Sequence, residues 1–142
     1  MELIPTTHKF VAVINKKVPI GNAMNALAHA TAGLVGMYPE ISDLRFDDYI
    51  DKDGNHHQSI SDNPFIILRA DNSNKLHNLR VALVEAGVAF TDFTNTMTVG
   101  TYAEQRARTA ATPEGELEYF CIVMFGAIDK IEPLTKKFSL WH

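Results

Sequence analysis

Short apolar runs and longer stretches of helical spacing alternate along the chain. The runs K-F-V-A-V-I-N at 9–15 and F-I-I-L-R at 65–69 are apolar on both faces and rich in β-branched residues, which is typical of buried strands. Further strands are predicted at 45–51, 88–93 and 117–125. A hairpin-type turn, D-G, follows the first of these three, and a short return strand is a candidate after it.

The segments between the predicted strands have the spacing of helices. Residues 21–36 consist largely of Ala and other small residues, which let a helix lie close to a sheet or to another helix. Leucines recur at helical spacing over 76–83, and Gly87 follows as a typical helix end. Shorter helices are predicted at 101–110 and around 131–138.

Strands and helices alternate throughout, without repeats, linkers or low-complexity tracts. The pattern therefore predicts a single domain over residues 1–142 with an α/β fold of three layers. We expect a mixed sheet of about four to five strands with helices on both faces. A chain of 142 residues is long enough to bury a core without metals or disulfides.

Composition limits the classes of function. The formal charge of -4 argues against nucleic acid as the main partner, because phosphate contacts need clustered Lys and Arg. The single Cys cannot form an internal disulfide and suits a reducing compartment. No signal-peptide pattern, no apolar run of roughly 20 residues and no metal or cofactor motif is found in the sequence. We therefore expect a cytoplasmic protein without membrane partner, cofactor or metal.

The most informative polar residues follow the first predicted strand. Lys17, Gly21 and Asn22 lie between this strand and the first helix, where ligands tend to bind in open α/β sheets. Asn22, Asn25 and His29 are three and four residues apart, so one helical face carries all three. His29 is a candidate base, and the asparagines are candidate substrate contacts. Alternatively, Asn22 caps the helix, Asn25 faces water, and His29 bonds to a backbone carbonyl in the core.

A second polar group, Thr94, Asn95 and Thr96, ends the predicted strand at 88–93. If this strand neighbours the first one, these side chains face the asparagine–histidine stripe across one cleft with apolar walls. Such a cleft is typical of small-molecule sites. The alternative is a turn in which the Thr and Asn side chains satisfy backbone groups.

The remaining candidates favour structural roles. Asp51–Asn55 resembles part of a calcium loop, but the position of its Gly favours a hairpin turn. Cys121 lies inside an apolar strand, which indicates a buried, inert thiol. Arg106 and Arg108 stand near Glu104, as is typical of a solvated helix face.

Several motifs carry a resemblance to known families. The pattern K-x-x-x-G-x-x-x-x-A-x-A-H-A, from Lys17 to Ala30, resembles the amino-terminal signature of peptidyl-tRNA hydrolase 2. The chain is more similar to a bacterial family related to that fold, domain of unknown function 2000. The similarity lies in N-A-L-A-H-A (Asn25–Ala30), H-N-L-R-x-A-L (His77–Leu83), F-T-x-T-M (Phe93–Met97) and K-K-F-S-L (Lys136–Leu140). The resemblance implies a mixed sheet flanked by helices and commonly a homodimer.

The same resemblance speaks against the hydrolase activity. Peptidyl-tRNA hydrolase 2 enzymes usually carry a Lys after the glycine that matches Gly21, and this chain has Asn22. They carry a Gln three residues before the histidine, where this chain has Ala26, and an Asp that falls on Asn95 here. Of these positions, His29 and Gly21 alone match. Alternatively, Lys17 supplies a charge from the preceding loop and Asp92 replaces the carboxylate after a small shift. Without a positioned cation and carboxylate, tRNA ester hydrolysis is disfavoured but stays an open alternative.

Three hypotheses follow for the function. The first is a peptidyl-tRNA hydrolase 2-like domain whose changed cleft binds a small polar or peptide-like ligand. The second is a hydrolase of peptidyl-tRNA, or of a similar ester or amide, with His29 as base. The third is a dimeric interaction or regulatory module, with Phe138, Leu140 and Trp141 as the expected contacts.

Overall fold

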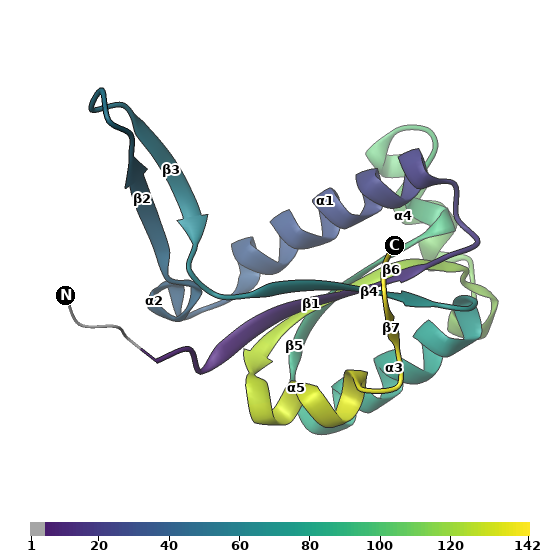
Figure 1. Cartoon of the computed structure of the whole chain (residues 1–142). Helices are drawn as coiled ribbons and strands as arrows, with labels where there is room; N and C mark the ends of the chain where they lie inside the picture. The colour runs from purple at the N-terminus through teal and green to yellow at the C-terminus, as the bar shows by residue number, and fades with distance from the viewer. Residues whose placement is uncertain (1–4) are drawn as a thin grey trace.

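The main sheet of the protein is mixed and has five strands in the order β5-β6-β1-β4-β7 (Figure 1). It is seen in a computed structural model that describes residues 5–142. The strands are β1 (His8–Asn15), β4 (Phe65–Ala70), β5 (Ala89–Thr94), β6 (Tyr119–Ala127) and β7 (Ser139–Leu140). β1 is parallel to β4, and the other neighbouring pairs are antiparallel. β1 and β6 lie in the middle of the sheet and are buried on both faces, which explains their continuous apolar sequences.

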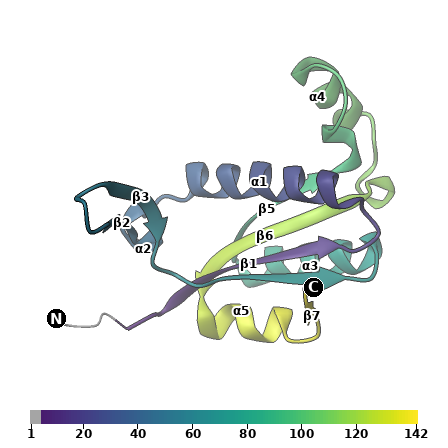
Figure 2. The same ribbon diagram turned by 45° about the horizontal axis from the view of Figure 1, so that its top comes forward.

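Helices cover both faces of this sheet, as the sequence predicts (Figure 2). One face carries α1 (Ile20–Met37), and the opposite face carries α3 (Ser73–Ala86) and α5 (Ile128–Thr135). α1 lies over β5 and β6 and buries Ala23, Ala26, Ala30 and Leu34. Because three of these four side chains are Ala, the helix axis can approach the sheet closely. The mixed α/β prediction is confirmed.

The chain beyond β5 forms a separate small substructure at one end of the sheet. A 3₁₀ turn η1 (Asn95–Met97) leads to α4 (Tyr102–Ala110), which stands away from the three layers in Figure 2. A second 3₁₀ turn, η2 (Glu114–Glu116), leads back to β6. The predicted helix at 101–110 is confirmed within one residue.

The strand predicted at 45–51 does not join the main sheet. It is β2 (Phe46–Ile50), which pairs with β3 (His56–Ser61) in a separate two-stranded hairpin after the short helix α2 (Ile41–Leu44). This hairpin projects from the body on the side of the sheet that carries α1 (Figure 1). The predicted turn is confirmed: Asp51 Oδ1 accepts bonds from the backbone N–H groups of Asp53 and Asn55 at 2.9 and 3.0 Å.

The carboxyl-terminal segment differs from the prediction. The last helix ends at Thr135, and the chain then turns into β7, where Leu140 pairs with Leu68 of β4. Trp141 continues this contact, since its backbone N–H donates to the carbonyl of Ile67 at 3.0 Å. A strand of two residues is too short to show a hydrophobic period, so the sequence pattern could not reveal β7.

Candidate functional site

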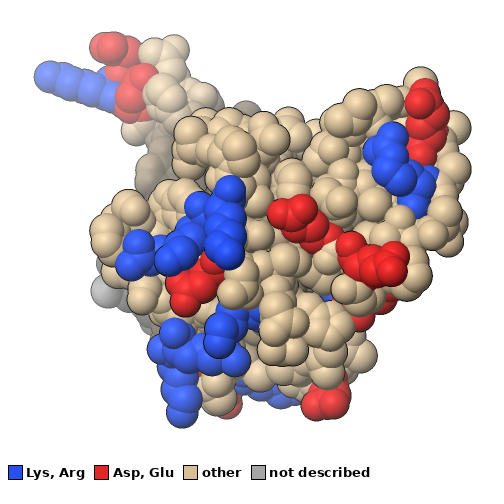
Figure 3. Space-filling model, turned by 90° about the vertical axis from the view of Figure 1, so that its right-hand side faces the viewer, with Lys and Arg blue, Asp and Glu red and all other residues tan. Residues whose placement is uncertain are grey.

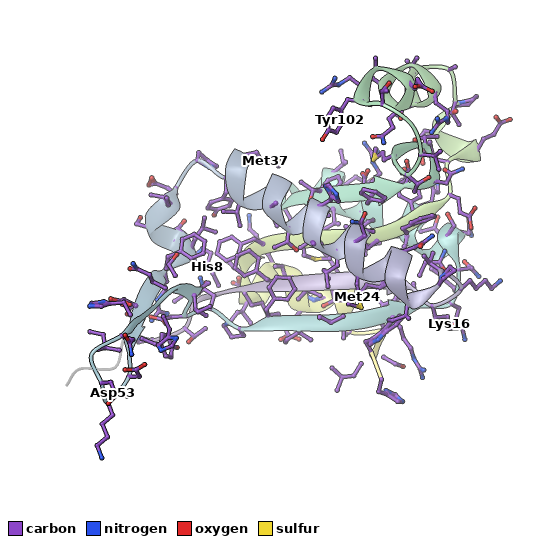
Figure 4. The ribbon with its side chains drawn as sticks, turned by 90° about the horizontal axis from the view of Figure 1, so that it is seen from above. His8, Lys16, Met24, Met37, Asp53 and Tyr102 are labelled. Atoms are coloured by element: carbon purple, nitrogen blue, oxygen red, sulfur yellow. The ribbon has the colours of Figure 1, made fainter. Side chains whose placement is uncertain are left out.

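A groove of about 720 Å³ lies between α1, the end of β5 and the segment from η1 to α4. Asn25 and His29 line it from α1, and Met97, Tyr102 and Gln105 line it from the other side. Tyr102 is 76% exposed, and in Figure 4 it projects from the start of α4. The groove joins residues that are about 70 positions apart in the sequence, because α1 packs across β5.

The predicted stripe on α1 enters the groove only in part. Asn25 and His29 are exposed, and neither side chain forms a hydrogen bond with any residue from 5 to 142. The ring of His29 lies 5.8 Å from that of Phe93, centroid to centroid. Lys17 and Asn22 are exposed as well, but they lie nearer the start of the helix and outside the groove lining.

Asn22 does not cap this helix. The helix begins at Ile20, one residue before Gly21, and Pro19 occupies the N-cap position without a side-chain hydrogen bond. Asn22 therefore lies in the first turn, where its side chain faces solvent. Gly21 is exposed and has open space where a Cβ would stand, so the fold itself does not require a glycine there.

The second predicted group serves the structure of the turn after β5. Thr94 and Thr96 are buried, and their hydroxyl oxygens lie 2.7 Å apart. Thr109 donates to Thr96 Oγ1 at 2.8 Å, which ties α4 to η1. The side-chain oxygen of Asn95 accepts the backbone N–H of Glu118 at 3.0 Å. None of the three predicted residues lines the groove.

The predicted cleft required the strand before Thr94 to lie next to the first strand, but β5 is not a neighbour of β1. β6 lies between them, so the two polar groups do not follow adjacent strands. The opposing wall is built instead from Thr91, Phe93, Met97 and the residues that lead into α4. The hydroxyl of Thr91 donates to the carbonyl of Ala30 at 2.6 Å, which joins β5 directly to α1 beneath the groove.

The groove is close to neutral. Asp92 is the one charged residue that lines it within residues 5–142, and its carboxylate accepts from Arg80 Nε at 3.3 Å. Burial raises the pKa of Asp92, and the adjacent Arg80 guanidinium opposes this rise. No Lys or Arg of the described chain lines the groove, so it offers no cation to a phosphate group.

Comparison with known proteins identifies the family. The family model for "Protein of unknown function (DUF2000)" matches residues 8–142. The chain belongs to the DUF2000 family. A DUF2000 assignment names no activity, and no curated protein matches the chain.

A solved structure shares the fold of this DUF2000 protein. It is a protein of unknown function from Agrobacterium tumefaciens strain C58, with a TM-score of 0.83 and 15% identity. The similarity covers 97% of this chain and 100% of that one. At this identity the likeness concerns the fold alone.

The outer wall of the DUF2000 groove is held in place by Arg108. Its guanidinium donates to the carbonyl of Thr96 at 3.1 Å and to that of Val99 at 3.0 Å. Thr101 and Glu104 form a capping box at the start of α4, in which Thr101 Oγ1 accepts the Glu104 N–H at 3.2 Å. The sequence pattern favoured a solvated helix face for Arg108. In the structure, Arg108 instead fastens the loop from η1 to α4.

A hydrogen-bonded cluster forms at the same end of the main sheet, where α3 approaches η2. Glu114 accepts from the hydroxyl of Tyr119 at 2.8 Å and lies 2.6 Å from the ring nitrogen of His77. Burial acts against ionisation of Glu114, but the bonds from Tyr119 and His77 lower its pKa overall. The cluster thus joins β6 and α3 to the loop that precedes β6.

Two further structural results concern metals and membranes. Within residues 5–142, no group of three His, Cys, Asp or Glu side chains is arranged to hold a metal ion. No helix of the described chain has the length and apolar character needed to cross a bilayer.

Proposed function

We propose that this DUF2000 protein binds a small, uncharged, peptide-like ligand in the groove between α1 and α4. The observation that carries the proposal is the pair Asn25 and His29. Both line the groove, and neither has a hydrogen-bond partner within residues 5–142. An amide side chain offers donors and an acceptor together, which is the complement of a peptide group.

The size and polarity of the groove support the same class of ligand. Its volume of about 720 Å³ falls within the roughly 300–1,000 Å³ of small-molecule pockets. Phe93, Met97 and Tyr102 supply apolar and aromatic surface for a side chain. The described lining residues offer no cation to a phosphorylated or strongly anionic ligand, so a neutral amide is favoured over a nucleotide or a tRNA end.

The groove gives less support to a hydrolase. A histidine base is normally held in one orientation by a second group, and His29 has no hydrogen-bond partner to do so within residues 5–142. We therefore expect that neither the wild type nor His29→Ala releases tRNA from blocked aminoacyl-tRNA. Turnover that is present in the wild type and lost in His29→Ala would instead support the hydrolase.

The proposed relation to peptidyl-tRNA hydrolase 2 is one of fold with changed chemistry. It is supported by the motif from Lys17 to Ala30 and by the mixed sheet flanked by helices. A cytoplasmic location belongs to the same proposal and is supported by the single cysteine, Cys121, which is unpaired and buried.

Ligand binding can be tested with thermal unfolding in the presence of N-acetylated amino-acid amides and blocked di- and tripeptides. A ligand at 100 times its dissociation constant adds about 2.7 kcal/mol to the stability of the folded state, which is a visible shift. Asn25→Ala should reduce the shift, and Asn22→Ala is the matched control because it removes an exposed Asn of the same helix outside the groove. Equal loss in the two variants would contradict the proposed site.

A second candidate function, homodimer formation, is favoured by the hairpin. A two-stranded hairpin is marginally stable alone in water, yet this one leaves Tyr49, Ile50 and Ile60 more than half exposed. α1 is equally uncovered: Ile20, Met24 and Met37 are more than half exposed, and its 18 residues include no charged side chain.

We propose that the hairpin of one copy packs on α1 of a second copy. The hairpin carries four aspartates and one lysine, and two of the aspartates, Asp48 and Asp51, lie beside His56 and His57. Its remaining acidic charge disfavours contact with another hairpin, whereas α1 has no Asp, Glu, Lys or Arg to oppose the contact. The carboxyl-terminal residues fit this role less well, because Phe138 and Trp141 are half-buried and Leu140 alone is well exposed.

Light scattering after size-exclusion chromatography tests this assembly. We expect the wild type to have twice the 15.8 kDa mass of the chain and Met24→Glu to have the monomer mass. Val84→Glu is the control, because Val84 is 57% exposed on α3, at the opposite face of the sheet. A monomeric wild type would contradict the proposal.

A further inference from the structure

Basic side chains gather at the end of the molecule where β1 and β4 finish (Figure 3). A hollow of about 200 Å³ at this end is lined by Arg69, Lys75 and Lys137, together with Asp71 and Phe138. Lys16 reaches the same carboxylate, with its Nζ 3.1 Å from Asp71 Oδ1. We call Lys16, Arg69, Lys75 and Lys137, arranged around Asp71, the basic cluster.

Four separate segments of the fold bring these side chains together. Lys16 follows β1, and its backbone N–H donates to the carbonyl of Ala70 at the end of β4 at 3.0 Å. Arg69 is in β4, in register with Ser139 of β7. Lys75 lies in the first turn of α3, and Lys137 precedes β7. The cluster therefore depends on the tertiary structure rather than on a basic run in the sequence.

The positive charges of this cluster outnumber the carboxylates that the described residues place beside them. Asp71 is the single carboxylate among residues 5–142 that lines the hollow. The hydrogen bond and the charge of Lys16 lower the pKa of Asp71, with smaller contributions from Lys75 and Arg69. Among residues 5–142, Arg69, Lys75 and Lys137 form no ion pair with a carboxylate. Three like charges thus share one small hollow in a chain with 17 acidic and 13 basic residues. Their mutual repulsion would be relieved by an anion.

We propose that the basic cluster binds the phosphate group of a small phosphorylated molecule. Three cations without a carboxylate partner within residues 5–142 call for an anion of more than one negative charge, which a phosphate supplies and a single carboxylate does not. The Arg69 guanidinium can hold two phosphate oxygens at once, and the two lysines act as point charges. The location agrees with the general rule that ligands of open α/β sheets lie outside the carboxyl ends of the strands.

The size of the hollow limits the ligand. At about 200 Å³ it is smaller than the roughly 300–1,000 Å³ of pockets for drug-sized ligands, so it accepts a phosphate and the few atoms attached to it. Phe138 supplies an apolar wall for these atoms. No residue of this hollow lines the neutral groove, so the two sites are separate and neither proposal depends on the other.

Isothermal titration calorimetry at constant ionic strength tests this inference. The probes are inorganic phosphate, which represents the free anion, and glycerol 3-phosphate, which represents a phosphate ester. We expect saturable binding with one site per chain, tighter for the ester than for inorganic phosphate because Phe138 provides apolar contact for the attached atoms. Lys75→Gln and Lys137→Gln should each weaken binding about tenfold, because each removes a charge-assisted hydrogen bond.

Lys52→Gln is the control, because Lys52 is exposed in the turn of the distant hairpin and should leave binding unchanged. The inference is overturned if both probes fail to saturate at millimolar concentration, or if the control weakens binding as much as the cluster variants. It is also overturned if a single-stranded RNA binds this end far more tightly than either probe. That result would make the cluster a nucleic-acid surface.

Discussion

Arg108 provides a sharp test of how the groove is built. Its guanidinium donates to the carbonyl oxygens of Thr96 and Val99 and so fastens the loop that carries the outer wall. Arg108→Gln removes the guanidinium group, and the shorter amide side chain can replace at most one of the two hydrogen bonds. The exposed Arg106, two residues away, forms no hydrogen bond within residues 5–142, so Arg106→Gln is a matched control with the same change of charge.

The magnitude follows from these contacts. Hydrogen bonds to charged groups contribute roughly 1.5–3 kcal/mol each when desolvated. Arg108 is only half-buried, and water can replace part of the loss at the Val99 carbonyl, so we expect about 1–2 kcal/mol for Arg108→Gln. This lowers the melting temperature by about 3–8 °C in a domain of this size. Arg106→Gln should change the free energy of unfolding by less than about 0.5 kcal/mol.

Urea unfolding followed by circular dichroism measures both free energies. Amide hydrogen exchange adds a local readout, since the amides of residues 97–101 should exchange faster in Arg108→Gln than in the control. Equal stability and equal exchange in the two variants would show that the guanidinium bonds do not hold the wall. Arg108 would then not be the residue that holds the outer wall of the groove.

Three further outcomes are expected. Leu34→Ala should lower the free energy of unfolding by about 2–5 kcal/mol in urea titrations, because Leu34 is fully buried between α1 and the sheet; a loss below about 1 kcal/mol would mean that α1 is not packed as described. Burial raises the pKa of Cys121 to about 12, so iodoacetamide at pH 8 should alkylate it only in unfolded protein, and rapid labelling of the native protein would contradict this. The hydrogen bond from His57 and the backbone bond from Asn55 hold the pKa of Asp51 below its ordinary value of 3.8, so the stabilising contribution of this carboxylate is present above that pH and lost as the pH falls through the lowered value. Carboxyl-carbon NMR should show His57→Ala moving the Asp51 pKa upward, and an unchanged pKa would refute the role of that bond.

Much of the fold could be predicted because its main determinants are local. β1 and β6 are buried on both faces and therefore have continuous apolar sequences. The end of α3 follows from Gly87, which adopts a positive φ of 68° that glycine tolerates well.

The remaining features of the fold depend on non-local pairing. The position of β6 between β1 and β5 depends on its pairing with β1, which lies more than 100 residues earlier in the chain. The separation of the β2–β3 hairpin from the main sheet has no signature in its own sequence pattern. β7 forms only because Leu140 reaches β4 after α5 has turned the chain.

The candidate site also has a part that local sequence spacing predicts and a part that depends on tertiary packing. Helical spacing put Asn25 and His29 on one face, and both line the groove. The sequence could not predict that Tyr102 and Gln105 line the same groove, because their proximity to Asn25 and His29 depends on the packing of α1 across β5. Short polar side chains at a strand end fit both a pocket and a turn, and the hydroxyl of Thr94 is used in the turn.

The most direct test of the central claim is a ¹H–¹⁵N NMR titration of the wild type with blocked di- and tripeptides. We predict saturable shifts for amides of the groove, above all Asn25, His29, Met97 and Gln105, together with the side-chain amide signals of Asn25. The signals of Asn22 and of the hairpin should stay in place. Shifts confined to another surface, or no saturable shift with any peptide of the panel, would contradict the claim that this groove binds a neutral peptide-like ligand.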